Sequence, residues 1–202
     1  MKIEKLTKDN IKEFIRDLNL DNYDIEKDIN KLDYYGVKED DVFYMSFIVL
    51  SEDDCIAIKH INKKLSDNKF LEFINYLNNS LVSKTHLIIR LYDDKYMKIL
   101  NNKYKCKDMF ISIEREEVDS NLKEKFAEID MYNIRYLYSK KDIVCNLIRQ
   151  NIQDVDMINR LHDYFVILDT NNISFIINED LYDLLEGLGY KCIYKSYVIN
   201  EI

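Results

Sequence analysis

Residues 86–113, HLIIRLYDDKYMKILNNKYKCKDMFISI, carry the pattern on which the predicted fold depends. An apolar run, an acidic pair, a short amphipathic stretch and a second apolar run predict a strand, a helix and a strand in that order. The same outline returns in residues 172–199, NISFIINEDLYDLLEGLGYKCIYKSYVI. The sequence therefore predicts one strand-helix-strand unit that is used twice.

The two segments agree in identity and in apolar phase when they are aligned without gaps at an offset of 86 positions. Six of the 28 aligned positions are identical, namely Asp94 with Asp180, Tyr96 with Tyr182, Tyr104-Lys105-Cys106 with Tyr190-Lys191-Cys192, and Ile113 with Ile199. The apolar residues of the first strand align as well, Leu87, Ile89 and Leu91 with Ile173, Phe175 and Ile177. Agreement at both levels favours an internal repeat.

Composition limits the class of protein. The chain has 202 residues, of which 47% are apolar, enough for one sizeable core or two small ones. No apolar run approaches the about 18 residues of a membrane span, and the first twenty residues are charged throughout, so we expect a cytoplasmic protein without a membrane partner. The net charge of -8 argues against nucleic acid as a ligand.

Several kinds of site are disfavoured by residue spacing. The chain has 3 glycines, at positions 36, 187 and 189, too few and too far apart for a dinucleotide fingerprint, a Walker A loop or a nucleophile elbow. The 4 cysteines are widely separated, and we expect buried thiols in a reducing compartment. His60, His86 and His162 are isolated, so no metal site is expected.

The first half of the chain reads as alternating strands and helices. We expect a strand from Lys2 to Leu6, a helix capped by Thr7, and a second helix that ends near Gly36. VFYMSFIVL and CIAIKHI predict a hairpin, and KFLEFINYLNNSL predicts a helix capped by Ser66 or Asp67. These elements lead directly into residues 86–113.

The second half begins with VDSNLKEKFAEID, a charged segment that suits a linker or a surface helix. MYNIRYLY then predicts a strand, and DIVCNLIRQNI and DVDMINRLHD predict two helices. YFVILDT and NISFIIN predict two strands around a polar turn.

The element order of residues 1–116 resembles the GNAT superfamily of acyl-CoA-dependent N-acetyltransferases. DLYDLLEGLGYKCIYKSYVI is similar to that family's closing helix, Gly-aromatic turn and strand, with Gly189-Tyr190 at the turn and Lys103-Tyr104 in the equivalent place of the first copy. The resemblance implies an α+β fold, with a mixed, mostly antiparallel sheet and helices on its faces. It also implies a tandem of a GNAT-like unit at 1–116 and a second, shorter one at 117–202.

The resemblance further implies acetyl-CoA as the cofactor, held where two parallel strands splay and where a glycine-rich loop binds the pyrophosphate at a helix N-terminus. The corresponding stretch here, KHINKKLSDNKF, has no glycine. His60, Lys63, Lys64 and Ser66 are the candidate cofactor-binding residues. The alternative is a solvated lysine pair ahead of an ordinary capped helix.

The catalytic residues that the family would use are not evident. The tyrosine that often protonates the departing thiolate would lie at Ile99 or Leu185, and both are apolar. Tyr96 and Tyr182 suit the edge of a core, and Glu52, Asp53 and Asp54 are only eligible as a base. The pairs Asp93-Asp94 and Glu179-Asp180 are explained by N-capping through Asp94 and Asp180.

Two functions follow from this reading. The first is a divergent acyl-CoA-dependent N-acyltransferase or acyl-CoA binder. The second is a catalytically silent GNAT-like scaffold that acts through an unknown protein partner or through homo-oligomerisation, and the missing glycine loop and tyrosine acid favour it. A cleft between the IAIKHI and HLIIRLY strands would separate the two, because a closed, hydrogen-bonded strand pair leaves no room for pantetheine.

Overall fold

The computed structural model describes residues 1–20, 32–50, 55–80, 87–114, 142–166 and 172–199. Contacts within the chain group it into two units: unit 1 comprises Met1–Lys105 and Ser196–Ile202, and unit 2 comprises Cys106–Lys195. The predicted boundary between residues 116 and 117 lies outside the described residues and stays a prediction. No helix among the described residues is long and apolar enough to cross a membrane.

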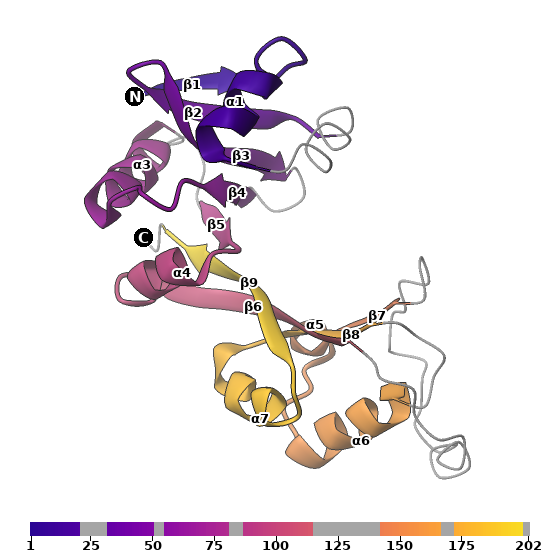
Figure 1. Ribbon diagram of the computed structural model, residues 1–202. Coiled ribbons are helices and arrows are strands. Elements are labelled where there is room, and N and C mark those ends of the chain that lie inside the picture. The colour runs from indigo at the N-terminus through magenta and orange to yellow at the C-terminus, as the bar shows by residue number, and fades with distance from the viewer. Residues whose placement is uncertain (21–31, 51–54, 81–86, 115–141, 167–171, 200–202) are drawn as a thin grey trace. The chain divides into compact units, whose positions relative to one another are not determined.

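Unit 1 is built on a mixed sheet in which β1 to β5 lie in sequence order and the last residues of β9 lie beside β5 (Figure 1). Neighbouring strands from β1 to β4 are antiparallel, whereas β4 and β5 are parallel. The strands are β1 (Lys2–Lys5), β2 (Tyr34–Glu39), β3 (Val42–Leu50), β4 (Cys55–Ile61), β5 (Ile88–Leu91) and β9 (Lys191–Val198). The predicted hairpin over β3 and β4 is confirmed.

Helices cover both faces of this sheet, and they are α1 (Ile11–Leu18), α3 (Asp67–Ser80) and α4 (Asp94–Asn101). Phe47 contacts Phe73 of α3, with ring centroids 5.8 Å apart. Ile48, the next residue of the strand, belongs to the core cluster that contains Phe14 of α1. Because successive strand residues point to opposite faces, α1 and α3 lie on opposite sides of β3.

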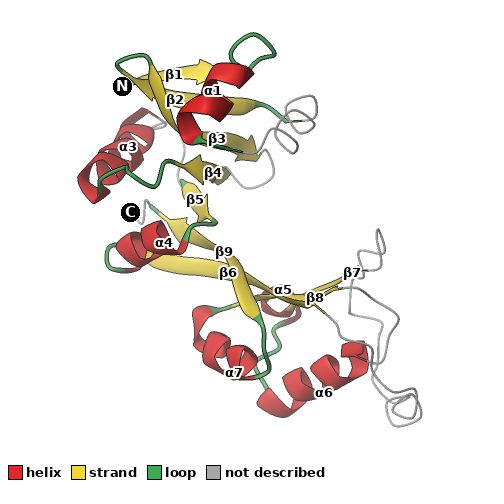
Figure 2. Cartoon of the chain, viewed as in Figure 1, coloured by secondary structure: helices red, strands yellow, loops and turns green. Residues whose placement is uncertain are grey.

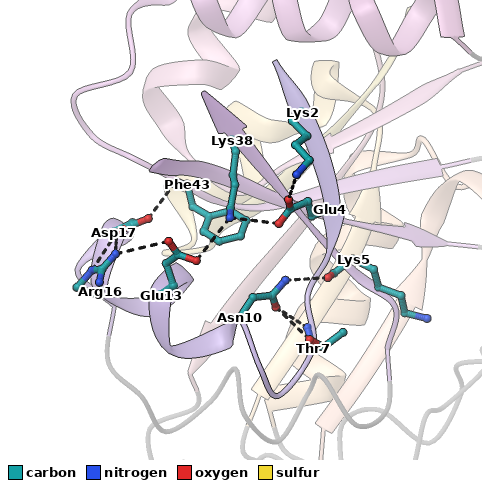
Figure 3. Close-up of polar contacts among 10 residues, drawn as sticks. All are labelled: Lys2, Glu4, Lys5, Thr7, Asn10, Glu13, Arg16, Asp17, Lys38 and Phe43. Carbon is teal, nitrogen blue, oxygen red and sulfur yellow. Dashed lines mark hydrogen bonds and ion pairs between the residues drawn. The ribbon is translucent and has the colours of Figure 1, made fainter. Parts of the chain in front are cut away.

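A buried lysine joins three elements of unit 1 (Figure 3). The Nζ atom of Lys38 on β2 lies 3.2 Å from a carboxylate oxygen of Glu4 on β1 and 3.5 Å from one of Glu13 on α1. It also lies 4.3 Å from the ring centroid of Phe43. Burial disfavours the charge of Lys38, but the two carboxylates outweigh burial and raise its pKa.

Two details of the first half differ from the sequence predictions. The predicted cap is Thr7, but helix α1 begins at Ile11, after Asn10. The Asn10 side chain accepts from the Thr7 N–H at 2.7 Å and donates to the Lys5 carbonyl at 3.1 Å, which holds the residues before Ile11 in a turn. Gly36 ends no helix; it lies inside β2, where it pairs with Ser46 of β3. The apolar residues predicted to form the preceding helix, Ile25 and Ile29, lie outside the described residues.

Unit 2 is also built on a mixed arrangement of strands, which lie in the order β9-β6-β8-β7 (Figure 2). β6 and β8 are antiparallel, and β7 and β8 are parallel. Its further elements are β6 (Lys105–Glu114), β7 (Asp142–Asn146), α5 (Leu147–Gln150), α6 (Val155–Val166), β8 (Asn172–Ile177), the 3-10 helix η3 (Glu179–Leu181) and α7 (Tyr182–Gly187). Met109, Ile111, Phe165, Phe175 and Tyr190 are central to its core. The predicted α+β class, with a mostly antiparallel sheet, is confirmed.

The predicted helix over residues 142–152 is largely wrong. Residues 142–146 form β7, in which Ile143 and Cys145 are buried and Val144 between them is half-buried, and only a short helix follows. The predicted strand that begins at Tyr164 is also wrong for its first three residues, because Tyr164 to Val166 complete α6. A short apolar run fits both the helical spacing of apolar residues and that of a buried strand, so sequence alone does not separate helix from strand here.

Both segments quoted from the sequence contain a strand, a helix and a strand. Residues 86–113 include β5, α4 and β6, and residues 172–199 include β8, η3, α7 and β9. The helix starts differ in detail. Asp93, rather than Asp94, caps α4 by accepting from the N–H groups of Lys95 and Tyr96, whereas no side-chain cap is found at the start of η3 or α7, so the predicted cap at Asp180 is wrong.

Candidate functional site

The pairing of the parallel strands β4 and β5 covers the whole of β5. Their pairing runs from Cys55 with Ile88 to Ile58 with Leu91, and β4 continues to Ile61. At the same point Lys59 is an extra residue in the pairing with β3, because Ile58 pairs with Phe47 and His60 pairs with Ser46. Such a bulge bends the strand that carries it and increases its local twist. The bulge therefore follows directly on the last paired residue, Ile58, whose partner Leu91 is also the last residue of β5.

Side chains from the start of α4 lie against the loop that follows β4. The hydroxyl of Tyr96 donates to the carbonyl oxygen of Leu65 at 3.0 Å, and the ammonium group of Lys95 donates to the same oxygen at 3.1 Å. Tyr96 is 1% exposed, and its ring centroid lies 4.6 Å from that of Phe70. Burial raises the pKa of Tyr96, so its hydroxyl stays protonated at neutral pH. Tyr96 is thus a core residue.

A cavity of about 350 Å³ lies at the N-terminus of α3 and is lined by Glu39, Val42, Tyr44, Asn62, Lys64, Leu65, Ser66 and Lys69. The Oγ atom of Ser66 accepts from the N–H of Lys69 at 3.3 Å, so the predicted cap at Ser66 is confirmed. Helix N-termini favour anions through their unpaired N–H groups and the helix dipole. Lys64 and Lys69 add two ammonium groups to this end of the helix.

Acidic and phenolic groups complete the cavity. Glu39 forms an ion pair with Lys69, which raises the pKa of Lys69 and lowers that of Glu39 through their hydrogen bond and charge. Tyr44 is an extra residue of β3 in its pairing with β2, because Met45 pairs with Val37 and Phe43 with Lys38. Burial, followed by two nearby carboxylates, raises the pKa of Tyr44 to about 12. Its hydroxyl is therefore protonated at neutral pH.

The predicted cofactor-binding residues are not all at this cavity. Lys64 and Ser66 line it, and Lys63 is exposed in the adjoining turn. His60 points to the opposite face: its Nδ1 atom lies 2.9 Å from the Oγ of Ser46, and its ring centroid is 6.1 Å from that of Phe14 on α1. The residues that were eligible as a base, Glu52 to Asp54, lie outside the described residues.

Sequence reasoning missed two lining residues, Glu39 and Tyr44. Glu39 lies at the end of a strand that was not predicted, and Tyr44 is placed by a bulge. Neither feature has a clear sequence signature, although the acidic turn after Glu39 could have indicated a hairpin.

Burial disfavours the reactive thiolate form of two cysteines, Cys106 and Cys145. Cys55 and Cys145 are buried, and Cys106 and Cys192 are half-buried. Burial raises the pKa of Cys106 to about 12 and that of Cys145 to about 11. Reactive cysteines have lowered pKa values, so Cys106 and Cys145 suit a structural role.

No protein-family model matches the chain, and no curated protein matches it either. Three solved structures are similar in arrangement. A conserved protein of Enterococcus faecalis V583, described as a probable N-acyltransferase, is 10% identical with a TM-score of 0.37 over 98% of this chain and 71% of that one. A tandem GNAT protein from the clavulanic acid biosynthesis pathway is 5% identical with a TM-score of 0.42 over 100% of this chain and 99% of that one.

The third is a GNAT-family acetyltransferase from Colwellia psychrerythraea, 10% identical with a TM-score of 0.39 over 98% of each chain. These identities and TM-scores are too low for any residue, ligand or activity to be inferred from them. The parallel β4–β5 pair, with α3 between the two strands in sequence, agrees with the expectation from the sequence. The chain has an α+β fold with a mixed, mostly antiparallel sheet and helices on its faces.

Proposed function

We propose that unit 1 binds an acyl-CoA and serves as an acyl-CoA-dependent N-acyltransferase. The observation that carries this proposal is a cavity with two lysines at the N-terminus of α3, the helix that joins the parallel strands β4 and β5. Lys64 and Ser66 would contact the phosphates of CoA, and Lys63 would reach them from the exposed turn. Their side chains would replace the backbone approach that a glycine-rich loop allows.

The chemistry is a direct transfer. A neutral amine attacks the thioester carbonyl and forms the new carbon–nitrogen bond, the carbon–sulfur bond breaks, the nitrogen releases one proton to solvent, and the departing thiolate takes one up to give CoA. Tyr96 is not assigned to this protonation, because its hydroxyl already donates to the carbonyl oxygen of Leu65. Protonation from solvent is sufficient for a thiolate leaving group at neutral pH, since a thiol pKa is only about 8.5.

A second candidate is a GNAT-like scaffold without catalysis that binds a protein partner or a second copy of itself. It is favoured by Tyr96 and Lys95, whose hydrogen bonds to Leu65 fasten α4 to the loop after β4. A ligand between the ends of β4 and β5 would have to displace these contacts.

Titration calorimetry of the full chain with acetyl-CoA tests the first proposal. We expect heat that saturates in the micromolar range. Lys64→Gln should weaken binding about tenfold, because a charge-assisted contact to phosphate is lost. Lys98→Gln, a change on the exposed side of α4, is the matched control and should bind as the wild type does. No heat at millimolar acetyl-CoA would overturn the enzyme proposal and leave the scaffold.

A further inference from the structure

Unit 2 contains its own cavity, of about 400 Å³, where the end of β6 meets the starts of β8 and β9. Its lining residues include Ser112, Glu114, Lys191 and Ile193. The volume falls within the about 300–1,000 Å³ of typical small-molecule sites. All of these residues belong to unit 2, so the cavity is independent of the site proposed in unit 1.

Local backbone geometry forms one wall of this cavity. Gly189 also lines it and has a φ of 95°, in the left-handed region that favours glycine. A Cβ atom at Gly189 would lie 3.1 Å from the Cδ1 of Ile113, so only glycine lets this turn close against β6 without a shift. The turn leads directly into β9 and so brings Lys191 beside the end of β6.

The polar floor of the cavity is held in place by strand side chains. Ser174 donates its hydroxyl to the Oγ of Ser112 at 2.9 Å, and Ser112 donates in turn to the carbonyl of Ile173 at 3.4 Å. The Oγ of Ser112 is therefore fixed in position. It retains a lone pair, because a hydroxyl can accept twice.

Opposite charges line this cavity without pairing. Within the described part of the chain, neither Glu114 nor Lys191 has an ion pair or a side-chain hydrogen bond. Two unpaired charges of opposite sign around one cavity complement a ligand that carries both an ammonium and a carboxylate group. Ile193, an exposed large apolar side chain, offers a contact for an aliphatic group beside them.

We propose that this cavity binds a small zwitterion of the α-amino acid class with an aliphatic side chain. The ligand ammonium group pairs with Glu114, its carboxylate pairs with Lys191, and its side chain packs on Ile193. Charge-assisted contacts of this kind are about twice as strong as neutral hydrogen bonds.

The test uses the ¹⁵N-labelled full chain and L-leucine as the probe, followed by amide chemical shifts. We expect saturable shifts at Glu114, Gly189 and Lys191. L-Leucinamide lacks the carboxylate and 4-methylpentanoate lacks the ammonium group, and each should bind about tenfold more weakly. Equal responses to all three compounds would overturn the proposal, as would the absence of saturable shifts at these residues.

Matched variants test whether leucine binds at this cavity. Glu114→Gln and Lys191→Gln change exposed side chains, so folding should be preserved, and each should weaken leucine binding about tenfold. Lys107→Gln, an exposed position of β6 outside the cavity, should leave binding unchanged. Leucine-dependent shifts centred on Lys64 of unit 1 instead would overturn the assignment to unit 2. The outcome with acetyl-CoA has no bearing on this test.

Discussion

Ile199 donates its backbone N–H to the carbonyl oxygen of Leu87 across 2.9 Å. Ile113 and Ile173 are register partners in the pairing of β6 with β8. The two pairs are equivalent in the alignment of the two segments, in which Leu87 corresponds to Ile173 and Ile113 corresponds to Ile199. The first strand of each aligned segment thus pairs with the last strand of the other.

The C-terminal residues should therefore stabilise unit 1. Tyr197 is 0% exposed, and its hydroxyl oxygen lies 2.6 Å from the Oδ1 of Asn101 and 3.1 Å from the carbonyl oxygen of Met97. We expect Tyr197→Phe to lower the free energy of unfolding by about 1 kcal/mol, and Tyr197→Ala by about 3 kcal/mol or more. Urea unfolding measures both. Tyr76→Phe, on the exposed side of α3, should have no effect.

Two glycines should respond to alanine in opposite directions. A Cβ at Gly36 would lie 2.4 Å from the ring of Phe43 and 2.8 Å from Leu6, so Gly36→Ala should destabilise the protein by about 1–3 kcal/mol through overpacking. At Gly187, inside α7, a Cβ meets nothing within 4 Å. Gly187→Ala should stabilise by up to about 1 kcal/mol. Thermal unfolding compares the two; equal shifts would contradict this account of the packing around Gly36.

The ion pairs of Lys38 should affect stability at acidic pH. Hydrogen bonds from Lys2 and Lys38 lower the pKa of Glu4 from 4.5. As the pH falls, Glu4 takes up its proton in the unfolded state before it does so in the folded state. Its ion pairs therefore add to the free energy of unfolding above about pH 4.5, and this addition is lost as the pH falls through the lower pKa of the folded state. In Lys38→Met this loss should be smaller, because one of the two partners is gone.

Unfolding free energies measured from pH 7 to pH 3 check this prediction. Lys12→Met, which removes an exposed charge of α1, is the matched control. The raised pKa of Lys38 itself keeps its ion pairs intact at neutral pH; they weaken only as the pH rises past that folded value. A Lys38→Met profile parallel to that of the wild type would contradict the pairing.

His162 should behave as a partly buried imidazole. Its Nδ1 atom lies 3.0 Å from the hydroxyl of Tyr190, a residue that is 1% exposed. Burial lowers the pKa of His162 from 6.5, against the charge of Asp163. Stability should therefore decline as the pH falls below about 6.5, because the unfolded state takes up the proton first. The NMR titration of the imidazole should give a midpoint below 6.5, and a midpoint above it would contradict the prediction.

Tyr190→Phe provides the complementary test of the same contact. The variant removes a buried hydroxyl that bonds to His162 and should cost about 1 kcal/mol of unfolding free energy at neutral pH. Burial raises the pKa of Tyr190, so the hydroxyl is protonated throughout the measured range. Tyr164→Phe, at a half-buried position of α6, is a suitable comparison.

The parts of the fold that could be predicted are those with a strong, unambiguous period. Residues 42–50 and 55–61 are long, apolar and β-branched, and the helix at 67–80 has four buried residues at helical spacing. Residues 142–146 were misassigned because Ile143, Val144 and Leu147 fit a helical stripe as well as a strand. These residues form a strand because they pair with β8, and no local sequence pattern predicts that pairing.

The site was partly predictable for the same reason. Ser66 could be identified because a capping residue precedes a periodic helix, and Lys64 because it lies close to that cap in sequence. Tyr44 and His60 could not be placed, because each lies at or next to an extra residue in a strand, and such residues change the face that a side chain occupies.

The extra residue at Lys59 has a consequence for engineering this chain. Side chains alternate along a strand, yet Ile58 and His60 lie on opposite faces because Lys59 intervenes as a bulge. A straight β4 of the same length would turn His60 to the side of Phe73, whereas deleting Lys59 would leave His60 opposite Ser46, on the side of Phe14. The imidazole therefore keeps its surroundings only in a strand that either retains the bulge or is one residue shorter.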